Sequence, residues 1–147
     1  MCFEFRAITE DEVKEIASWN YEGYVEEVMM TPYFESFEKT GEWKGPGSCD
    51  GFAAFLDGEV AGLFEFNLKG HVMEIGLALR PDLIGKGLGV TYVEQGLEFG
   101  MHTYTTDLSF VMLTVDKRNE AAIRVYEKVG FRRVEEAEGE RKMVLSI

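Results

Sequence analysis

Three glycines stand within five residues in the segment GKGLG (85–89), between the strand-like MEIGLALRPD and the helix-like VTYVEQGLEFG. The first backbone amides of a helix have no partner inside it and carry the positive end of the helix dipole, so they bind anions. Gly85, Gly87 and Gly89 would let a phosphate approach these amides, and Lys86 would add a positive charge. A tight turn that packs a strand against a helix would use the same glycines, so the segment alone does not separate the two interpretations.

Two familiar phosphate-binding loops do not fit this segment. A Walker A loop has Ser or Thr after Gly-Lys, whereas Gly87 follows Lys86 here. A dinucleotide fingerprint has Gly or Ala where this chain has Val90. A module that binds nucleotide phosphates is therefore the least favoured of the functions considered.

A second group of residues lies on the helix predicted to begin at Asn119. Asn119, Ala122 and Tyr126 are three and four residues apart, so they share one helix face. The small side chain of Ala122 leaves space beside the helix, and Tyr126 places a phenol at the far end of that space. Taken singly, Asn119 is also an ordinary N-cap and Tyr126 an ordinary residue at the edge of a core. Together they favour the ligand-binding interpretation of the glycine loop.

The two segments together resemble the GNAT superfamily of acyl-CoA-dependent N-acetyltransferases. LALRPDLIGKGLG matches the family's strand and pyrophosphate loop, and NEAAIRVYEKVGF matches its second cofactor-contacting helix with the tyrosine. The resemblance covers residues 51–131 and is compatible with the whole chain. One departure is Ile84, where the family usually has Gln or Arg. Because backbone donors carry most of the pyrophosphate binding in this family, we expect weaker cofactor affinity and not loss of function.

The resemblance implies acetyl-CoA as cosubstrate, held between two parallel strands that splay apart. Its pantetheine amides would pair with the free edge of the first of these strands, and its pyrophosphate would lie on the amides of the loop. Asn119 and Ala122 would contact the cofactor from the second helix. The strand and loop residues implied are Leu77, Ala78, Leu79, Ile84, Gly85, Lys86, Gly87, Leu88, Gly89 and Val90.

The reaction implied is direct attack of a neutral primary amine on the thioester, with a backbone amide near Ala78 or Leu79 stabilising the oxyanion. Tyr126 would protonate the leaving thiolate. Since ordinary pKa values are about 10 for a phenol and about 8.5 for a thiol, this transfer is uphill by about 2 kcal/mol before the site tunes it. Glu74 or Glu65 would accept the ammonium proton. A strand glutamate is more often a solvent-facing residue, and gap-free alignment puts the family's strand glutamate at Met73, unless a bulge changes the alternation.

The elements that position these residues are expected to form a mixed α/β sheet of the GNAT type. Alternating segments and the Asp57-Gly58 turn predict an antiparallel meander, and the strand–helix–strand order from 71 to 115 predicts a parallel pair. Helices should cover both faces. The expected strands are 3–8, 51–56, 59–68, 71–79, 109–115 and a hairpin turning near Gly139, and the expected helices are 9–19, 21–40 broken by Pro32, 87–101 and 119–129.

Length and composition limit the classes of protein to which this chain can belong. The 147 residues fit a single domain (1–147), and no apolar run is long enough to cross a bilayer. The start of the chain does not resemble a secretory signal, and two cysteines suit a reducing compartment, so we expect a cytoplasmic protein. His71 and His102 have no neighbours at ligand spacing, so no metal is expected. A net charge of −12 argues against nucleic acid as a partner, and a membrane partner is not expected either.

The negative charge is concentrated in the N-terminal half. Residues 1–79 carry 16 acidic and 5 basic side chains, whereas residues 80–133 carry 7 and 8. A solubilising surface explains this, but so does a site that gathers a cationic amine near Glu26, Glu27, Glu35 and Glu38. A non-catalytic acyl-CoA sensor of the same fold is the alternative function, although Tyr126 favours the enzyme. A homodimer is left open.

Overall fold

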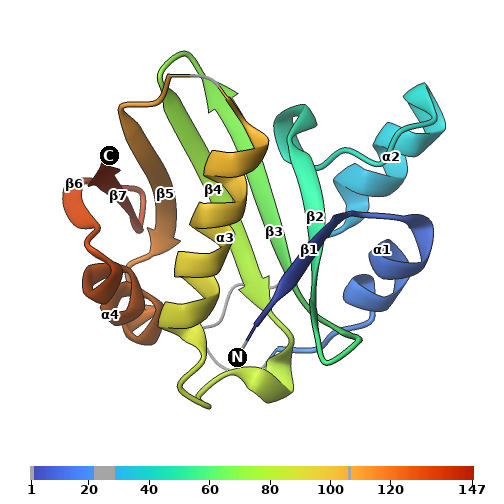
Figure 1. Cartoon of the computed structure of the whole chain (residues 1–147), viewed down its shortest axis with the longest axis horizontal. Coiled ribbons are helices and arrows are strands. Elements are labelled where there is room, and N and C mark those ends of the chain that lie inside the picture. Colours follow the sequence, from blue (N-terminus) through green and yellow to red (C-terminus); the bar gives the residue numbers. More distant parts are fainter. Residues whose placement is uncertain (1, 22–28, 106) are drawn as a thin grey trace.

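A computed structural model describes residues 2–21, 29–105 and 107–147, and within these ranges seven strands form one sheet in the order β1-β2-β3-β4-β5-β7-β6 (Figure 1). The strands are β1 (Glu4–Ala7), β2 (Asp50–Leu56), β3 (Glu59–Lys69), β4 (Val72–Leu79), β5 (Phe110–Asp116), β6 (Arg132–Ala137) and β7 (Glu140–Ser146). The helices are α1 (Glu10–Ala17), α2 (Thr31–Thr40), α3 (Gly89–Thr103) and α4 (Glu120–Val129), with short 3-10 turns at Pro46–Ser48 and Pro81–Leu83. None of the described helices is long and apolar enough to span a bilayer.

Strands β1 to β4 form the antiparallel meander that the sequence predicts. The β2–β3 hairpin turns on Asp57 and Gly58, with φ angles of 52° and 81°. Two successive residues with positive φ match the right-handed twist of the flanking strands, which explains why an Asp-Gly pair stands there. The β6–β7 hairpin repeats this geometry at Glu138 and Gly139.

Strands β4 and β5 are parallel, as predicted, but they pair only over Val72–Glu74 and its partner Phe110–Met112. Beyond Glu74 the two strands diverge toward their C-terminal ends (Figure 1). The crossover between them is α3, which passes over β3 and β4. The fold is therefore the mixed α/β sheet expected, with a gap between its two parallel strands.

Helices cover both faces of the sheet, and each face has its own core. Side chains of α3 and α4 pack with Phe64 and Phe66 on one face, whereas α1 and α2 pack with Leu63 on the other, because successive strand residues point to opposite faces. Burying one such side chain stabilises the fold by roughly 1.5–3 kcal/mol. α3 lies close to the sheet because Gly100 has no side chain, and a Cβ there would lie 2.5 Å from the ring of Phe66.

Two helix boundaries differ from those predicted. Pro32 does not break a helix: it stands in the first turn of α2, where a missing amide proton has no consequence. The earlier part of that predicted helix, 22–28, lies outside the described residues. α3 begins at Gly89 and not at Gly87, because Gly87 has a φ of +78°, which a right-handed helix excludes.

Candidate active site

A cavity of about 330 Å³ opens where β4 and β5 separate. Its walls are the C-terminal half of β4, the loop before α3, the first turn of α3, part of β5 and one face of α4. We call it the first cavity. Lys86 and Val90 do not line it; Lys86 is exposed and Val90 is half-buried. The other residues predicted to hold the cofactor all line the first cavity: Leu77, Ala78, Leu79, Ile84, Gly85, Gly87, Leu88, Gly89, Asn119, Ala122 and Tyr126.

The backbone of β4 alternates between β3 and the gap. The amide of Arg80 donates to the carbonyl oxygen of Ala61 on β3 (2.7 Å), so even-numbered residues of β4 direct their amides and carbonyls toward β3. Leu77 and Leu79 direct theirs toward β5, whose pairing with β4 has already ended. Of the two amides predicted for oxyanion stabilisation, that of Leu79 therefore faces the gap and that of Ala78 faces β3.

The glycine loop contains glycines of two kinds. Gly85 and Gly87 both have a φ of +78°, and a Cβ at either position would have no heavy atom within 4 Å. They permit a left-handed backbone and leave the loop surface open. Gly89 has another role, because a Cβ there would lie 2.8 Å from a methyl group of Val125 on α4. The loop thus combines an accessible backbone with close packing between α3 and α4.

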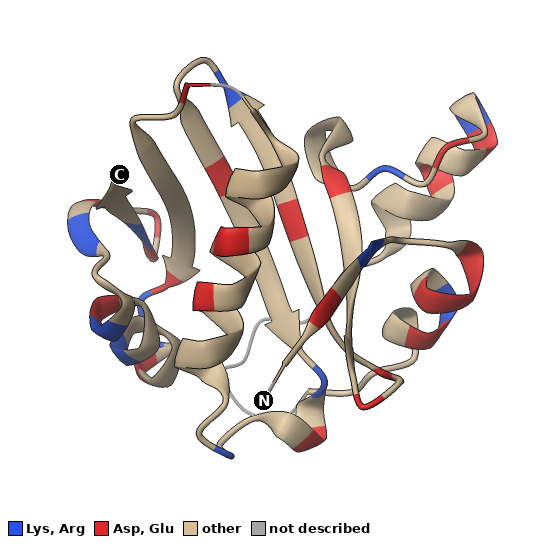
Figure 2. Ribbon diagram, viewed as in Figure 1, with Lys and Arg blue, Asp and Glu red and all other residues tan. Residues whose placement is uncertain are grey.

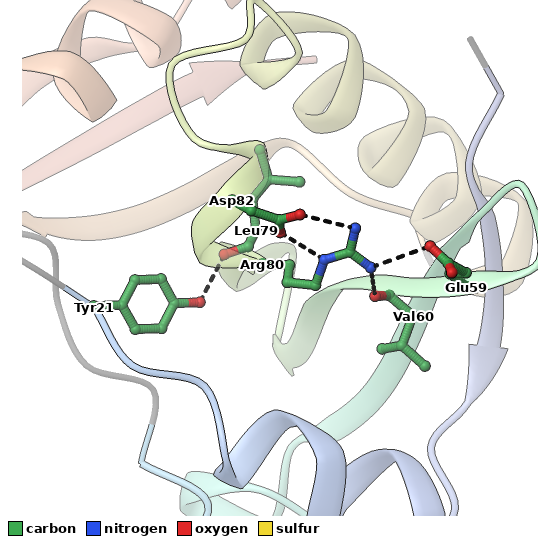
Figure 3. Close-up of polar contacts among 6 residues, drawn as sticks. All are labelled: Tyr21, Glu59, Val60, Leu79, Arg80 and Asp82. Carbon is green, nitrogen blue, oxygen red and sulfur yellow. Dashed lines mark hydrogen bonds and ion pairs between the residues drawn. The ribbon is translucent and has the colours of Figure 1, made fainter.

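Arg80 anchors the end of β4 beside this loop (Figure 3). Its Nη1 donates to the carbonyl oxygen of Val60 (2.8 Å), and its Nε donates to Oδ1 of Asp82 (2.6 Å). Glu59 lies 3.8 Å from the same guanidinium. The hydrogen bond with Asp82 raises the pKa of Arg80, which keeps the anchor charged. β3, β4 and the start of the loop are therefore held together at the rim of the first cavity.

Tyr21 contacts the same rim from the segment after α1 (Figure 3). Its hydroxyl donates to the carbonyl oxygen of Leu79 (2.6 Å), and its ring lines the first cavity. Burial raises the pKa of Tyr21 to about 12, so the hydroxyl keeps its proton near neutral pH. Tyr21 thus reaches the strand edge where the cofactor's amides are expected.

α4 presents one face to the first cavity. Asn119 caps the helix, because its Oδ1 accepts a hydrogen bond from the amide of Ala122 (3.2 Å). Asn119 and Ala122 also line the cavity, so capping does not remove them from it. Tyr126 is 9% exposed, lies edge-on to Phe131 with ring centroids 5.9 Å apart, and lines the same cavity. The three residues predicted to share a face do so.

A second cavity, of about 260 Å³, lies on the face of the sheet covered by α1 and α2. It shares Ile75, Gly76 and Thr114 with the first cavity, so the two meet at the gap between β4 and β5. Its remaining lining residues are polar or small: Pro46, Cys49, Glu65, Asn67 and Glu74.

Both glutamates considered as bases line the second cavity, in different settings. Glu74 is 3.0 Å from the ammonium of Lys69 at the rim. Glu65 is half-buried, and its Oε2 accepts a hydrogen bond from the hydroxyl of Tyr33 (2.6 Å). Burial raises the pKa of Glu65, and the bond from Tyr33 opposes that rise without cancelling it. The pairing of β3 with β4 has no register shift, so Met73, where the family's glutamate aligns, is buried on the other face.

The sequence did not reveal Tyr21 and Cys49, which line the first and second cavities, or Tyr33, which holds the carboxylate of Glu65. Cys49 is a buried free thiol whose pKa is raised by burial to about 12. Tyr33 is 32 residues away from its partner Glu65, and no local pattern connects them. Only the pairing of β2 with β3, and the packing of α2 beneath them, brings these side chains together.

The acidic side chains lie mainly around α1, α2 and the strands of the meander, while basic ones gather around α4 and the β6–β7 hairpin (Figure 2). Glu35 and Glu38 are exposed on α2 and line neither cavity. Glu26 and Glu27 lie outside the described residues. Within the described ranges, the carboxylates that line a cavity are those of Glu65 and Glu74.

The chain belongs to the Acetyltransferase (GNAT) family, whose model matches residues 11–131. Members of this family transfer acetyl groups from acetyl-CoA to amines. The chain is 36% identical over 83 residues to spermidine N(1)-acetyltransferase of Escherichia coli strain K12. This match covers 54% of this chain and 44% of that protein. It is 39% identical over 98 residues to mycothiol acetyltransferase of Streptomyces coelicolor, covering 63% of this chain and 29% of that protein. The chain thus spans less than half the length of these relatives.

Solved structures share the fold over nearly the whole chain. The Campylobacter jejuni N-acetyltransferase PseH in complex with acetyl coenzyme A superposes with a TM-score of 0.75 at 19% identity, covering 99% of each chain. A spermidine N-acetyltransferase SpeG chimera from Vibrio cholerae and hSSAT gives a TM-score of 0.75 at 21% identity, covering 98% of this chain and 95% of that one.

Proposed function

We propose that this chain transfers the acetyl group of acetyl-CoA to a primary amine by direct attack on the thioester. The observation that carries the proposal is the pair of cavities that meet at the gap between β4 and β5 from opposite faces of the sheet. This arrangement lets a cofactor and an acceptor approach one carbon atom from two sides. It is the geometry that a direct transfer requires.

Acetyl-CoA would occupy the first cavity. Its pantetheine amides would pair with the backbone of Leu77 and Leu79, and its pyrophosphate would lie on the amides of residues 85–90, where α3 begins. The exposed ammonium of Lys86 would add a charge contact from outside the cavity. Asn119, Ala122 and Tyr126 would contact the cofactor from α4.

The chemistry follows from what lies around the gap. As the amine nitrogen bonds to the carbonyl carbon, a backbone amide on the edge of β4 that faces the gap would donate to the developing oxyanion. The carbon–sulfur bond then breaks, and Tyr126 would protonate the thiolate. The second proton, which the nitrogen loses once it is acetylated, would return to the Tyr126 phenolate through water. The proton lost by the acceptor ammonium would pass to Glu65, directly or through water, with Glu74 as the second candidate for this role.

An acetylated enzyme is not part of this proposal. Cys49 is the thiol nearest the reaction, since it lines the second cavity. Burial raises its pKa to about 12, so a negligible fraction is thiolate near pH 7. A protonated thiol is a poor nucleophile, which supports direct attack by the amine.

The acceptor would enter the second cavity and would be a cationic amine. Glu65 and Glu74 line this cavity, and the chain carries a net charge of −12. The 36% sequence identity with a spermidine N(1)-acetyltransferase over 83 residues supports a polyamine as the acceptor.

Two free cysteines suit the reducing cytoplasm as the site of action. The homodimer stays a prediction, which sedimentation velocity tests.

The experiment incubates the protein with acetyl-CoA and a panel containing spermidine, an aminoglycoside, a free amino acid and a peptide with a free N-terminus. Released thiol is measured over time, and the acetylated product is identified by mass spectrometry. We expect thiol release with the polyamine and one acetyl group added to it. Binding of acetyl-CoA without thiol release from any amine would favour the sensor over the enzyme.

A further inference from the structure

Tyr33 and Glu65 form a pair that the reaction outlined above does not explain. Tyr33 is fully buried on α2, and its hydroxyl donates to Oε2 of Glu65 at 2.6 Å. The other carboxylate oxygen, Oε1, lies beside Gly76, which belongs to both cavities. We propose that Tyr33 is a positioning residue for acetyl transfer, which holds the Glu65 carboxylate at the junction of the cavities. This inference rests on the proposed function.

Glycines on three segments make room for this pair. A Cβ at Gly51 on β2 would overlap the Tyr33 hydroxyl, and one at Gly45 would lie 2.7 Å from it. A Cβ at Gly76 on β4 would lie 2.9 Å from Oε1 of Glu65. Real Cβ atoms essentially never approach this closely, so each position excludes a larger residue while the pair keeps its place. The backbone at these three positions therefore leaves the space that the hydrogen-bonded pair occupies.

The other ionisable groups considered near the pair either form an ion pair with a lysine or remain protonated. Asp50, which precedes Gly51, accepts a hydrogen bond from Lys44, and Glu74 across the second cavity pairs with Lys69. The thiol of Cys49 remains protonated because its pKa is raised by burial to about 12. Tyr92, which packs on the opposite face of β3 and β4, is also protonated, since burial raises its pKa well above its ordinary value. Among the described residues, Glu65 is thus the cavity-lining carboxylate that is held by a neutral hydroxyl and not by a cation.

The pair has a measurable consequence for the pH dependence of the reaction. Burial raises the pKa of Glu65, and the hydrogen bond from Tyr33 lowers it, because that bond stabilises the ionised carboxylate. A base must be ionised to accept a proton, so activity rises as pH rises through this pKa. Without the hydroxyl, the acidic limb of the pH profile should move to higher pH by about one unit, the usual scale for losing a hydrogen bond to a charged group.

The experiment compares pH profiles of kcat/KM for the parent, Tyr33→Phe and Tyr104→Phe. Tyr104→Phe is the matched control, because Tyr104 also donates its hydroxyl to a carboxylate, but its partner Asp50 lines neither cavity, whereas Glu65 lines the second. We expect the acidic limb to move by about one unit in Tyr33→Phe and not in Tyr104→Phe. In a Glu65→Gln background, Tyr33→Phe should leave the profile unchanged. Carbon-13 NMR of the Glu65 carboxyl, assigned by its loss in Glu65→Gln, should show the same rise in pKa independently of turnover.

The outcomes separate this inference from the proposed function. If the parent acetylates an amine but Tyr33→Phe merely lowers the melting temperature and kcat without moving the acidic limb, Tyr33 is structural and the inference fails. An unmoved carboxyl resonance in Tyr33→Phe leads to the same conclusion. If the parent acetylates no amine, the proposed function fails, and with it the catalytic meaning of the pair, whatever the NMR titration shows.

Discussion

Replacing Gly87 with Val separates the two roles a glycine can have in this loop. Gly87 has a φ of +78°, and a Cβ there would meet no heavy atom within 4 Å. A side chain at this φ costs roughly 1–2 kcal/mol, but its Cβ would clash with none of the described residues. The variant should therefore fold. Its methyl groups would stand where the pyrophosphate is expected, so acetyl-CoA should no longer bind.

The expected magnitudes can be compared on one scale. For 147 residues the unfolding entropy near the melting temperature is about 0.3 kcal/mol per degree, so the backbone strain should lower Tm by about 3–6 °C. Acetyl-CoA at 100 times its Kd stabilises the native state by about 2.7 kcal/mol, which is about 9 °C. Neither ATP nor NAD should reproduce that rise, since the loop has neither of their fingerprints.

Gly139→Val is the matched control for Gly87→Val. Gly139 has a φ of +82° and equally open surroundings, but it lies in the β6–β7 turn outside the first cavity. Thermal denaturation with and without acetyl-CoA should show a similar loss of Tm in both variants and a lost ligand response in Gly87→Val alone. An intact response in Gly87→Val would mean that the loop is only a turn, and equal loss in both variants would attribute the effect to stability.

Three further results are expected. Tyr126→Phe should lower kcat by roughly 100-fold or more with little change in acetyl-CoA affinity, as expected for a lost general acid, and parental turnover would remove Tyr126 from the mechanism. Tyr21→Phe should raise the KM for acetyl-CoA several-fold with kcat nearly unchanged, because it removes only the hydrogen bond to Leu79 at the strand edge; a fall in kcat alone would contradict this. With a cationic acceptor, kcat/KM should fall between low and physiological salt, where the Debye length shortens to about 8 Å, whereas the KM for acetyl-CoA should respond less. If turnover does not depend on salt, the net charge of −12 serves only to keep the protein soluble and does not attract the acceptor.

Much of the lining of the first cavity could be predicted from the sequence because its signals are local. The glycine loop, the N-cap at Asn119 and the face shared with Tyr126 each lie within about ten residues, where helix periodicity fixes which side chains share a face. Turn chemistry at Asp57-Gly58 likewise fixed the hairpin. Gly89 shows the limit of this reasoning, since its contact with Val125 depends on how α3 meets α4.

The surroundings of the second cavity could not be predicted in this way because they are assembled from distant segments. Strand register brings together four residues from α2, the position before β2, β3 and β4: Tyr33, Cys49, Glu65 and Gly76. The choice between Glu74 and Glu65 as base depends on burial and on Tyr33, which no sequence pattern reveals. The role of Pro32 in the first turn of α2 was misjudged, because proline breaks a helix in the interior but is favourable in the first turn.

The most direct test of the account is a crystal structure with CoA and the preferred amine bound together. The account predicts the pyrophosphate on the amides of residues 85–90 and the CoA sulfur in the gap between β4 and β5, beside Tyr126. The amine nitrogen should approach that sulfur from the second cavity, within reach of Glu65. An amine bound on the same face as CoA, or a CoA sulfur remote from the gap, would contradict it.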